Sequence, residues 1–234
     1  MTRRIACRAV FLDAGGVLVL PRRDLVAHAL ADAGAIIDPA AVPTAHYAAV
    51  RRLDAGEPAG YFEVLCRELG VPAPRVADAI ARLDWLADRT RSGEILWSEP
   101  AAGALHAIQS LTRAGIAVLV VSNSDGHAES NLRAAQVCQP GPGPGATVSA
   151  VIDSTVVGVE KPDPGIFEIA RRTAGTAREH VVHVGDMLGT DIAGAHAAGI
   201  VPIHLDPARR CRGRDHRHVR SLAGIWHHVV PAGP

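Results

Sequence analysis

The stretch Val10-Phe11-Leu12-Asp13-Ala14-Gly15-Gly16-Val17-Leu18 decides the fold, because an apolar run ends here in a carboxylate and two glycines. Residues 9–12 are apolar at odd and even positions alike, as in a strand of a parallel sheet that helices cover on both faces. Four later runs share this composition. They are residues 116–121, 148–152, 181–184 and 200–205. Together the five runs predict a buried parallel sheet.

Helical patterns lie between these runs. They cover residues 104–114, 164–174 and 190–198. The second of them begins well, because Asp163 can cap its N-terminus and Pro164 can occupy its first position. Strand alternating with helix predicts an α/β fold with a doubly wound parallel sheet.

Residues from about 22 to 98 break this alternation. Only helical patterns are found there, at residues 24–33, 61–69 and 75–86. The segment is too long for an ordinary connection between strands. The expected organisation is an α/β core formed by residues 1–20 and 99–234, with a small helical insertion at residues 21–98.

Composition excludes several classes of protein. The 234 residues contain 24 basic and 24 acidic side chains, so a generally basic nucleic-acid binder is not expected. Arg8 and Asp13 interrupt the apolar N-terminal run, which argues against a signal peptide. No apolar stretch is long enough to span a bilayer, so we expect a soluble cytoplasmic protein with no membrane partner.

Cysteines and histidines give no metal motif in the sequence. The four cysteines, at positions 7, 66, 138 and 211, are far apart and form no Cys-x-x-Cys pair, which is typical of reduced cytosolic thiols. The basic segment 209–218 lacks interleaved aromatic residues and is expected to be a solvated loop. His216, His218, His227 and His228 are interpreted as surface histidines, because nothing in the sequence fixes a coordination geometry.

Reactive side chains follow the predicted strands. Ligands of an open parallel sheet bind beyond the carboxyl ends of its strands. Asp13 follows the first strand, Ser122 the second, and Asp186 and Asp191 follow the strand at 181–184, while Lys161 is the only lysine of the chain. Three carboxylates repel one another unless a cation lies among them, and oxygen ligands favour Mg²⁺. Such a site with a lysine and a hydroxyl suits a phosphoryl group, and Asp13 could then act as nucleophile.

In this order and at these intervals, four motifs resemble the haloacid dehalogenase superfamily of aspartate-nucleophile hydrolases. They are Val10–Leu18, Val118–Asn123, Lys161–Phe167, and Val184-Gly185-Asp186 with Asp191 five positions on. The resemblance covers nearly the whole chain. It implies a Rossmann-like core, and the insertion after the first motif looks like that superfamily's first type of helical cap.

The resemblance also implies roles for single residues. Asp13 would be the nucleophile and a Mg²⁺ ligand, the backbone carbonyl of Gly15 a second ligand and Asp186 a third, with Asp191 supporting the metal site. The expected activity is the Mg²⁺-dependent hydrolysis of a small phosphorylated metabolite through an aspartyl phosphate.

The same resemblance assigns the substrate side of the site. Ser122 and Lys161 would be catalytic and hold the phosphate oxygens, with Asn123 beside them in substrate binding. Lys161 would also offset the charge of Asp13.

One position departs from the family pattern. Phosphatases of this family usually carry a second aspartate two residues after the nucleophile, and here that residue is Gly15. General acid-base groups contribute about 10²–10⁴-fold to rates, so the loss of this group should slow the hydrolysis of phosphate esters with poor leaving groups most. Two other hypotheses therefore stay open: a catalytically impaired member that binds a phosphometabolite or a protein partner, and a metal-independent 2-haloacid dehalogenase.

Overall fold

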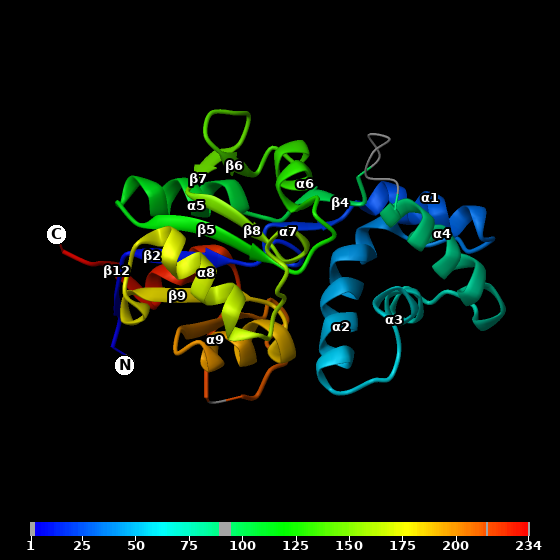
Figure 1. Cartoon of the computed structure of the whole chain (residues 1–234). Helices are drawn as coiled ribbons and strands as arrows, with labels where there is room; N and C mark the ends of the chain where they lie inside the picture. Colours follow the sequence, from blue (N-terminus) through cyan, green and yellow to red (C-terminus); the bar gives the residue numbers. More distant parts are fainter. Residues whose placement is uncertain (1–2, 89–94, 214, 234) are drawn as a thin grey trace. The chain divides into compact units, whose positions relative to one another are not determined.

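The computed structural model describes residues 3–88, 95–213 and 215–233, and it divides into two compact units. Unit 1 comprises Met1–Leu18 and Pro100–Pro234, and unit 2 comprises Val19–Glu99. Figure 1 colours the chain by sequence, so that unit 2 appears in blue to green. Residues 1–2, 89–94, 214 and 234 belong to segments considered above but lie outside the described residues.

A parallel sheet of six strands forms the centre of unit 1, in the order β11-β10-β9-β2-β5-β8. Its strands are β2 (Ala9–Leu12), β5 (Ala117–Ser122), β8 (Ala150–Asp153), β9 (Val181–Gly185), β10 (Val201–Leu205) and β11 (Arg217–Val219). All neighbouring pairs run parallel, with Leu12 level with Val120 on one side and with Val184 on the other. The predicted α/β fold with a parallel central sheet is confirmed.

Two details of the predicted sheet were wrong. The run at residues 148–152 is split, because it spans the end of β7 (Ala146–Val148) and the start of β8. The segment 209–218 is not a solvated loop throughout, since β11 pairs with β10 at the edge of the sheet. The consecutive polar residues Arg217 and His218 concealed this edge strand, because they lack an apolar strand pattern.

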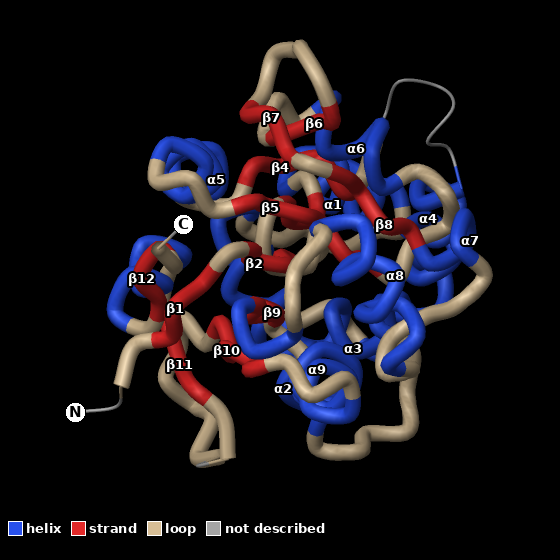
Figure 2. The backbone as a smooth tube through the Cα atoms, turned by 60° about the vertical axis from the view of Figure 1, so that its left-hand side comes forward, coloured by secondary structure: helices blue, strands red, loops and turns tan. Residues whose placement is uncertain are grey.

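Helices cover both faces of the sheet. Figure 2 shows α5 (Ala104–Arg113) on one side, and α8 (Pro164–Ala174) and α9 (Ala193–Ala197) on the other. Phe11, Leu119 and Val121 point from the strands into a core shared with Ile166 and Phe167 of α8. These five side chains are fully or almost fully buried, which fixes the central strands beneath the helix.

Two helix starts bear on the site that follows. The Asp163 carboxylate accepts the Gly165 N–H at 2.7 Å, which confirms this aspartate as the N-cap of α8. The segment predicted as one helix at 190–198 has a π-helical turn, η5 (Leu188–Ile192), before α9 begins. Single π turns inside helical segments often occur at functional sites.

Unit 2 is mainly helical. Its helices are α1 (Arg23–Asp32), α2 (Val42–Asp54), α3 (Tyr61–Glu68) and α4 (Val76–Asp88). Val26 and Leu30 of α1 are buried in one cluster with Leu83 of α4. The sequence did not predict α2, because its buried face consists largely of alanines and therefore lacks a strong apolar stripe. The pair of short strands β3 (Val19–Pro21) and β4 (Trp97–Pro100) was also not predicted.

The remaining elements are short. They are β1 (Ile5–Cys7), β6 (Cys138–Pro140), β12 (Val229–Pro231), α6 (Ala128–Ala134), α7 (Ser154–Val157), η1 (Pro39–Ala41), η2 (Ala73–Arg75), η4 (Arg178–His180) and η6 (Leu222–His227). Strand β1 pairs in parallel with β12, and β6 pairs with β7. None of the helices in the described part of the chain is long and apolar enough to span a bilayer.

Candidate active site

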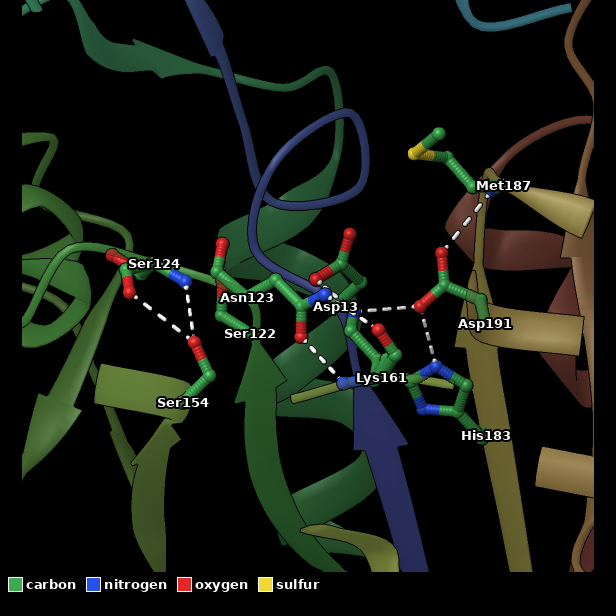
Figure 3. A network of polar contacts seen from close by, with 9 residues as sticks. All are labelled: Asp13, Ser122, Asn123, Ser124, Ser154, Lys161, His183, Met187 and Asp191. Carbon is green, nitrogen blue, oxygen red and sulfur yellow. Dashed lines mark hydrogen bonds and ion pairs between the residues drawn. The ribbon is translucent and has the colours of Figure 1, made fainter. Parts of the chain in front are cut away.

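Four loops at the carboxyl edge of the sheet bring the candidate residues together. Asp13 follows β2, Ser122 ends β5, Asp186 follows β9, and Lys161 lies just before α8. All four side chains belong to residues that are at most 8% exposed. Figure 3 shows Asp13 and Lys161 in one network of polar contacts with Asp191.

Lys161 joins two of the carboxylates. Its Nζ lies 2.6 Å from Asp13 Oδ1 and 2.7 Å from Asp191 Oδ1. Burial by itself lowers the pKa of a lysine, but here the attraction of Asp13 and Asp191 outweighs burial and raises the pKa of Lys161. The lysine is therefore held as an ammonium ion at neutral pH.

The pKa values of the two carboxylates are shifted in opposite directions. Burial raises the pKa of Asp13 to about 7, and repulsion by Asp191 and Asp186 adds to the shift while Lys161 opposes it. Burial also acts on Asp191, but Lys161 and His183 outweigh it and lower the pKa of Asp191. Asp13 is thus the carboxylate that most needs a further positive charge.

Asp191 is held from three sides. Its Oδ1 accepts Lys161 and lies 2.9 Å from His183 Nε2, and its Oδ2 accepts the Met187 N–H at 3.1 Å. The η5 turn carries Asp191 against the end of β9. Gly185 permits this approach, because a Cβ at that position would lie 2.1 Å from Asp191 Cγ. His183 was not singled out in the sequence, where it looks like any core residue of a buried strand.

Asn123 engages the main chain of Lys161. Its Nδ2 donates to the Lys161 carbonyl at 2.9 Å, and its Oδ1 accepts the Lys161 N–H at 2.8 Å. This paired contact fixes the lysine backbone beside the end of β5. In the structure the Asn123 side chain positions Lys161, while the Ser122 hydroxyl makes a long contact of 3.5 Å with the Asn123 carbonyl.

Asp153 and Ser154 shape the loop that follows β5, a role that was not predicted from the sequence. Asp153 accepts the Gly126 and Ala128 N–H groups at 3.1 and 3.0 Å. The Ser154 hydroxyl accepts the Ser124 N–H at 3.1 Å, a contact drawn in Figure 3. These bonds from the neighbouring strand hold the loop in place.

Asp13, Asp186 and Asp191 form what we call the carboxylate cluster. Each offers a ligand oxygen, and these oxygens lie within 4.8 Å of one another. One lysine cannot balance three carboxylates, and an all-oxygen donor set suits a hard divalent cation such as Mg²⁺. The residues present therefore fit a magnesium ion.

The family model for haloacid dehalogenase-like hydrolases matches residues 7–199. The chain belongs to this family. The match includes Asp13, Ser122, Lys161, Asp186 and Asp191, and it confirms the resemblance of the four motifs. The chain is thus a hydrolase of the haloacid dehalogenase family.

A curated relative matches over a short part of the chain. The glyceraldehyde 3-phosphate phosphatase of Methanopyrus kandleri is 47% identical over 55 residues, and the match covers 24% of this chain and 24% of that protein. The chain thus aligns with about a quarter of the length of this curated relative.

Solved structures match over nearly the full length at low identity. A dehalogenase with an intermediate complex has a TM-score of 0.63 at 17% identity, covering 97% of this chain and 99% of the other. The HAD-hydrolase YfnB of Bacillus subtilis, bound to magnesium, has a TM-score of 0.63 at 19% identity, covering 96% and 98%. At these identities the likeness shows the fold alone.

Proposed function

We propose that this hydrolase is a Mg²⁺-dependent phosphatase of small phosphorylated metabolites, with Asp13 as its nucleophile. The observation that carries the proposal is the buried Asp13 carboxylate, 2.6 Å from the Lys161 ammonium and within the carboxylate cluster. A phosphoryl group needs its oxygens neutralised while a nucleophile is held in line. The phosphatase name of the Methanopyrus relative supports the same substrate class.

Asp13, the Gly15 carbonyl and Asp186 would hold the magnesium ion, with Asp191 supporting the site. When bound, the ion would supply positive charge to the phosphate oxygens and to Asp13. That charge keeps Asp13 ionised against the effect of its burial. Asp191 has both of its oxygens engaged by Lys161, His183 and Met187, so its part is to hold the lysine.

The reaction takes two displacements at phosphorus. A carboxylate oxygen of Asp13 attacks the phosphorus atom and the bond to the leaving oxygen breaks, which gives an aspartyl phosphate and a leaving-group anion that takes its proton from solvent water. Water then attacks the same phosphorus, the bond to Asp13 breaks, and inorganic phosphate leaves. Lys161 and the Ser122 hydroxyl hold phosphate oxygens through both steps, and Asn123 keeps the lysine in position.

Gly15 shapes the substrate preference. It stands where the family pattern has an acid that protonates the leaving oxygen, so the leaving group must depart without that proton. We infer a preference for activated phosphates such as acyl or aryl phosphates. Unit 2, which follows β2 in the sequence, would act as the cap and select among them.

The test is an assay of the purified chain with Mg²⁺ against phosphate esters, acyl phosphates and aryl phosphates. Asp13→Asn should lower turnover roughly 10⁴-fold or more, because it removes the nucleophile. Asp163→Asn is the matched control and should keep full activity, since an amide can still cap α8. Equal activity of wild type and Asp13→Asn would contradict the proposal.

Gly15 also favours a second candidate, a member of the family that binds a phosphometabolite or a protein partner without turnover. Multiple turnover that depends on Asp13 would exclude it. Gly15→Asp refines the result: on phosphate esters of poor leaving groups it should raise activity by up to about 10²-fold if the missing acid limits the reaction. Release of halide from 2-haloacids that persists with a chelator would instead support the dehalogenase hypothesis.

A further inference from the structure

A second group of metal-ligating side chains lies in unit 1. His204, Cys211, His216 and His218, here called the Cys-His cluster, each offer one ligand atom, and these atoms lie within 4.8 Å of one another. None of the four belongs to the carboxylate cluster or to the four family motifs. We propose that the Cys-His cluster binds one structural Zn²⁺ ion.

The sheet itself brings three of these residues together. In the pairing of β10 with β11, His204 lies level with His218. His216 lies in the bend directly before β11, two positions ahead of His218. The ring centroids of His216 and His218 are 4.5 Å apart, and those of His204 and His216 are 5.4 Å apart. Figure 2 shows β11 beside β10 at the edge of the sheet.

In two of the histidines one ring nitrogen is engaged by an acceptor oxygen that does not belong to the cluster. His204 Nε2 lies 3.1 Å from the Asp186 carbonyl, which can only accept, so this nitrogen donates and Nδ1 carries the lone pair. His216 Nδ1 lies 2.8 Å from Asp215 Oδ1, so Nε2 carries its lone pair. Carboxylate and carbonyl partners of this kind orient histidine ligands in metal sites.

Several of the candidate ligand groups are buried. His204 is 6% exposed and the His216 side chain 3%. His204 Nδ1 and His218 Nε2 are buried and have no hydrogen-bond partner within residues 3–88, 95–213 and 215–233. A buried polar atom without a partner is costly, and a cation that accepts these lone pairs removes the cost.

The sulfur is placed as a fourth ligand. Cys211 Sγ lies 3.5 Å from His216 Nε2 and accepts the Gly213 N–H at 3.4 Å. Zinc bonds of about 2.0 Å to nitrogen and about 2.3 Å to sulfur put tetrahedral ligands roughly 3.3–3.6 Å apart. The Cys211 amide donates to Asp206 Oδ2 at 2.8 Å, and this bond holds the backbone that carries the thiol.

The donor set selects the metal and the role. One thiolate with three imidazoles suits Zn²⁺ and not Mg²⁺, which prefers oxygen. Four protein ligands fill a tetrahedral zinc ion and leave no position for water, as in structural sites. The ion would join the edge strand β11 and the loop before it to β10.

The test uses the full chain without an affinity tag, purified under reducing conditions, stripped of metal and titrated with Co²⁺. Binding of one equivalent should produce a thiolate-to-cobalt charge-transfer band and the intense visible bands of tetrahedral cobalt. One equivalent of Zn²⁺ should abolish both, and excess Mg²⁺ should not. Untreated protein should contain about one zinc per chain by mass spectrometry.

Variants separate the cluster from adventitious binding. Cys211→Ser should remove the charge-transfer band, and both it and His216→Gln should weaken zinc binding by at least about 100-fold. His227→Gln is the matched control, an exposed histidine outside the cluster that should bind like wild type. Absence of the band in reduced wild type, or a band unchanged in Cys211→Ser, would overturn the proposal. Neither result depends on hydrolase activity, so the proposed function is tested separately.

Discussion

The carboxylate cluster and the Cys-His cluster lie in the same unit of the molecule, yet they differ in donor atoms and in charge balance. The first has three buried carboxylates, two of which are engaged by Lys161 and one of these also by His183, and it lies at the carboxyl edge of the sheet where ligands bind. The second has three imidazoles and one thiol, with two buried nitrogens that no described residue satisfies.

This difference separates a site that can perform chemistry from one that can hold structure. A cation among oxygen ligands with open positions can share its charge with a substrate. A cation enclosed by four protein ligands can only stabilise the fold. A hydrogen bond from His204 Nε2 reaches the main-chain oxygen of Asp186, but the two clusters share no ligand side chain. Changes at one cluster should therefore leave the metal of the other bound.

The largest effect is expected at Lys161. Lys161→Met leaves Asp13 and Asp191 buried without their shared cation, which should destabilise the fold by about 3–5 kcal/mol. Loss of a charge that holds phosphate oxygens should also lower kcat/KM by about 10²–10³-fold. Denaturant unfolding and steady-state assays measure the two effects.

The control for this variant is Arg172→Met, which removes a cation whose side chain is 75% exposed. It should change neither stability nor rate, since exposed ion pairs contribute little. Zinc content should stay the same in both variants. A Lys161→Met protein as stable as wild type would show that the lysine does not balance the carboxylate cluster.

Sequence reasoning succeeded for the central strand of the fold, and it also named the side chains that the structure brings together at the end of that strand. The run ending at Asp13 is apolar on both faces and stops at a carboxylate, so it predicts a central strand and its reactive end together. Lys161 was identifiable because it is the only lysine. The sequence could not show that the Asn123 side chain pairs with the lysine backbone, because this contact needs the chain to return over 38 residues.

The Cys-His cluster was missed for a related reason. Its members lie on one strand, in a loop and on an edge strand, and only the register of β10 against β11 places His204 beside His218. The sequence pointed instead to surface histidines, which is wrong for His216, since its side chain is 3% exposed. Tertiary pairing made this site, so no local spacing could predict it.

A smaller effect is expected at Gly185, and it should affect only the carboxylate cluster. In Gly185→Ala the new Cβ would lie 2.1–2.5 Å from three atoms of Asp191, so the η5 turn must shift. Overpacking of this kind costs about 1–3 kcal/mol, and a displaced Asp191 loosens its hold on Lys161. The thermal unfolding temperature and kcat/KM should both fall.

Gly60→Ala provides the control for this substitution. A Cβ at Gly60 meets no atom within 4 Å, and its φ of −73° suits any residue. It should therefore unfold like wild type. Loss of zinc from Gly185→Ala would show that the two clusters are not independent, because the strain from the new Cβ would then extend to β10. An unchanged unfolding temperature would show that Asp191 has room to move.

The smallest expected effect is the pH dependence of Mg²⁺ binding at the carboxylate cluster, which the Cys-His cluster should not share. Burial raises the pKa of Asp13 to about 7, so the carboxyl is mostly ionised at pH 8 and mostly protonated at pH 6. Mg²⁺ must displace that proton at the lower pH, and its affinity should fall about tenfold between pH 8 and pH 6. Calorimetric titration at both values measures the change, and buffers of different ionisation enthalpy report the released proton.

Asp13→Asn isolates the titrating group. The amide carries no proton to displace, so its weaker Mg²⁺ binding should not change between pH 6 and pH 8. If wild type binds Mg²⁺ equally at both values, Asp13 is already ionised at pH 6 and the lysine alone offsets its burial. If the Mg²⁺ affinity of Asp13→Asn still falls tenfold between pH 8 and pH 6, another group titrates. The pH dependence of the carboxylate cluster would then not come from Asp13.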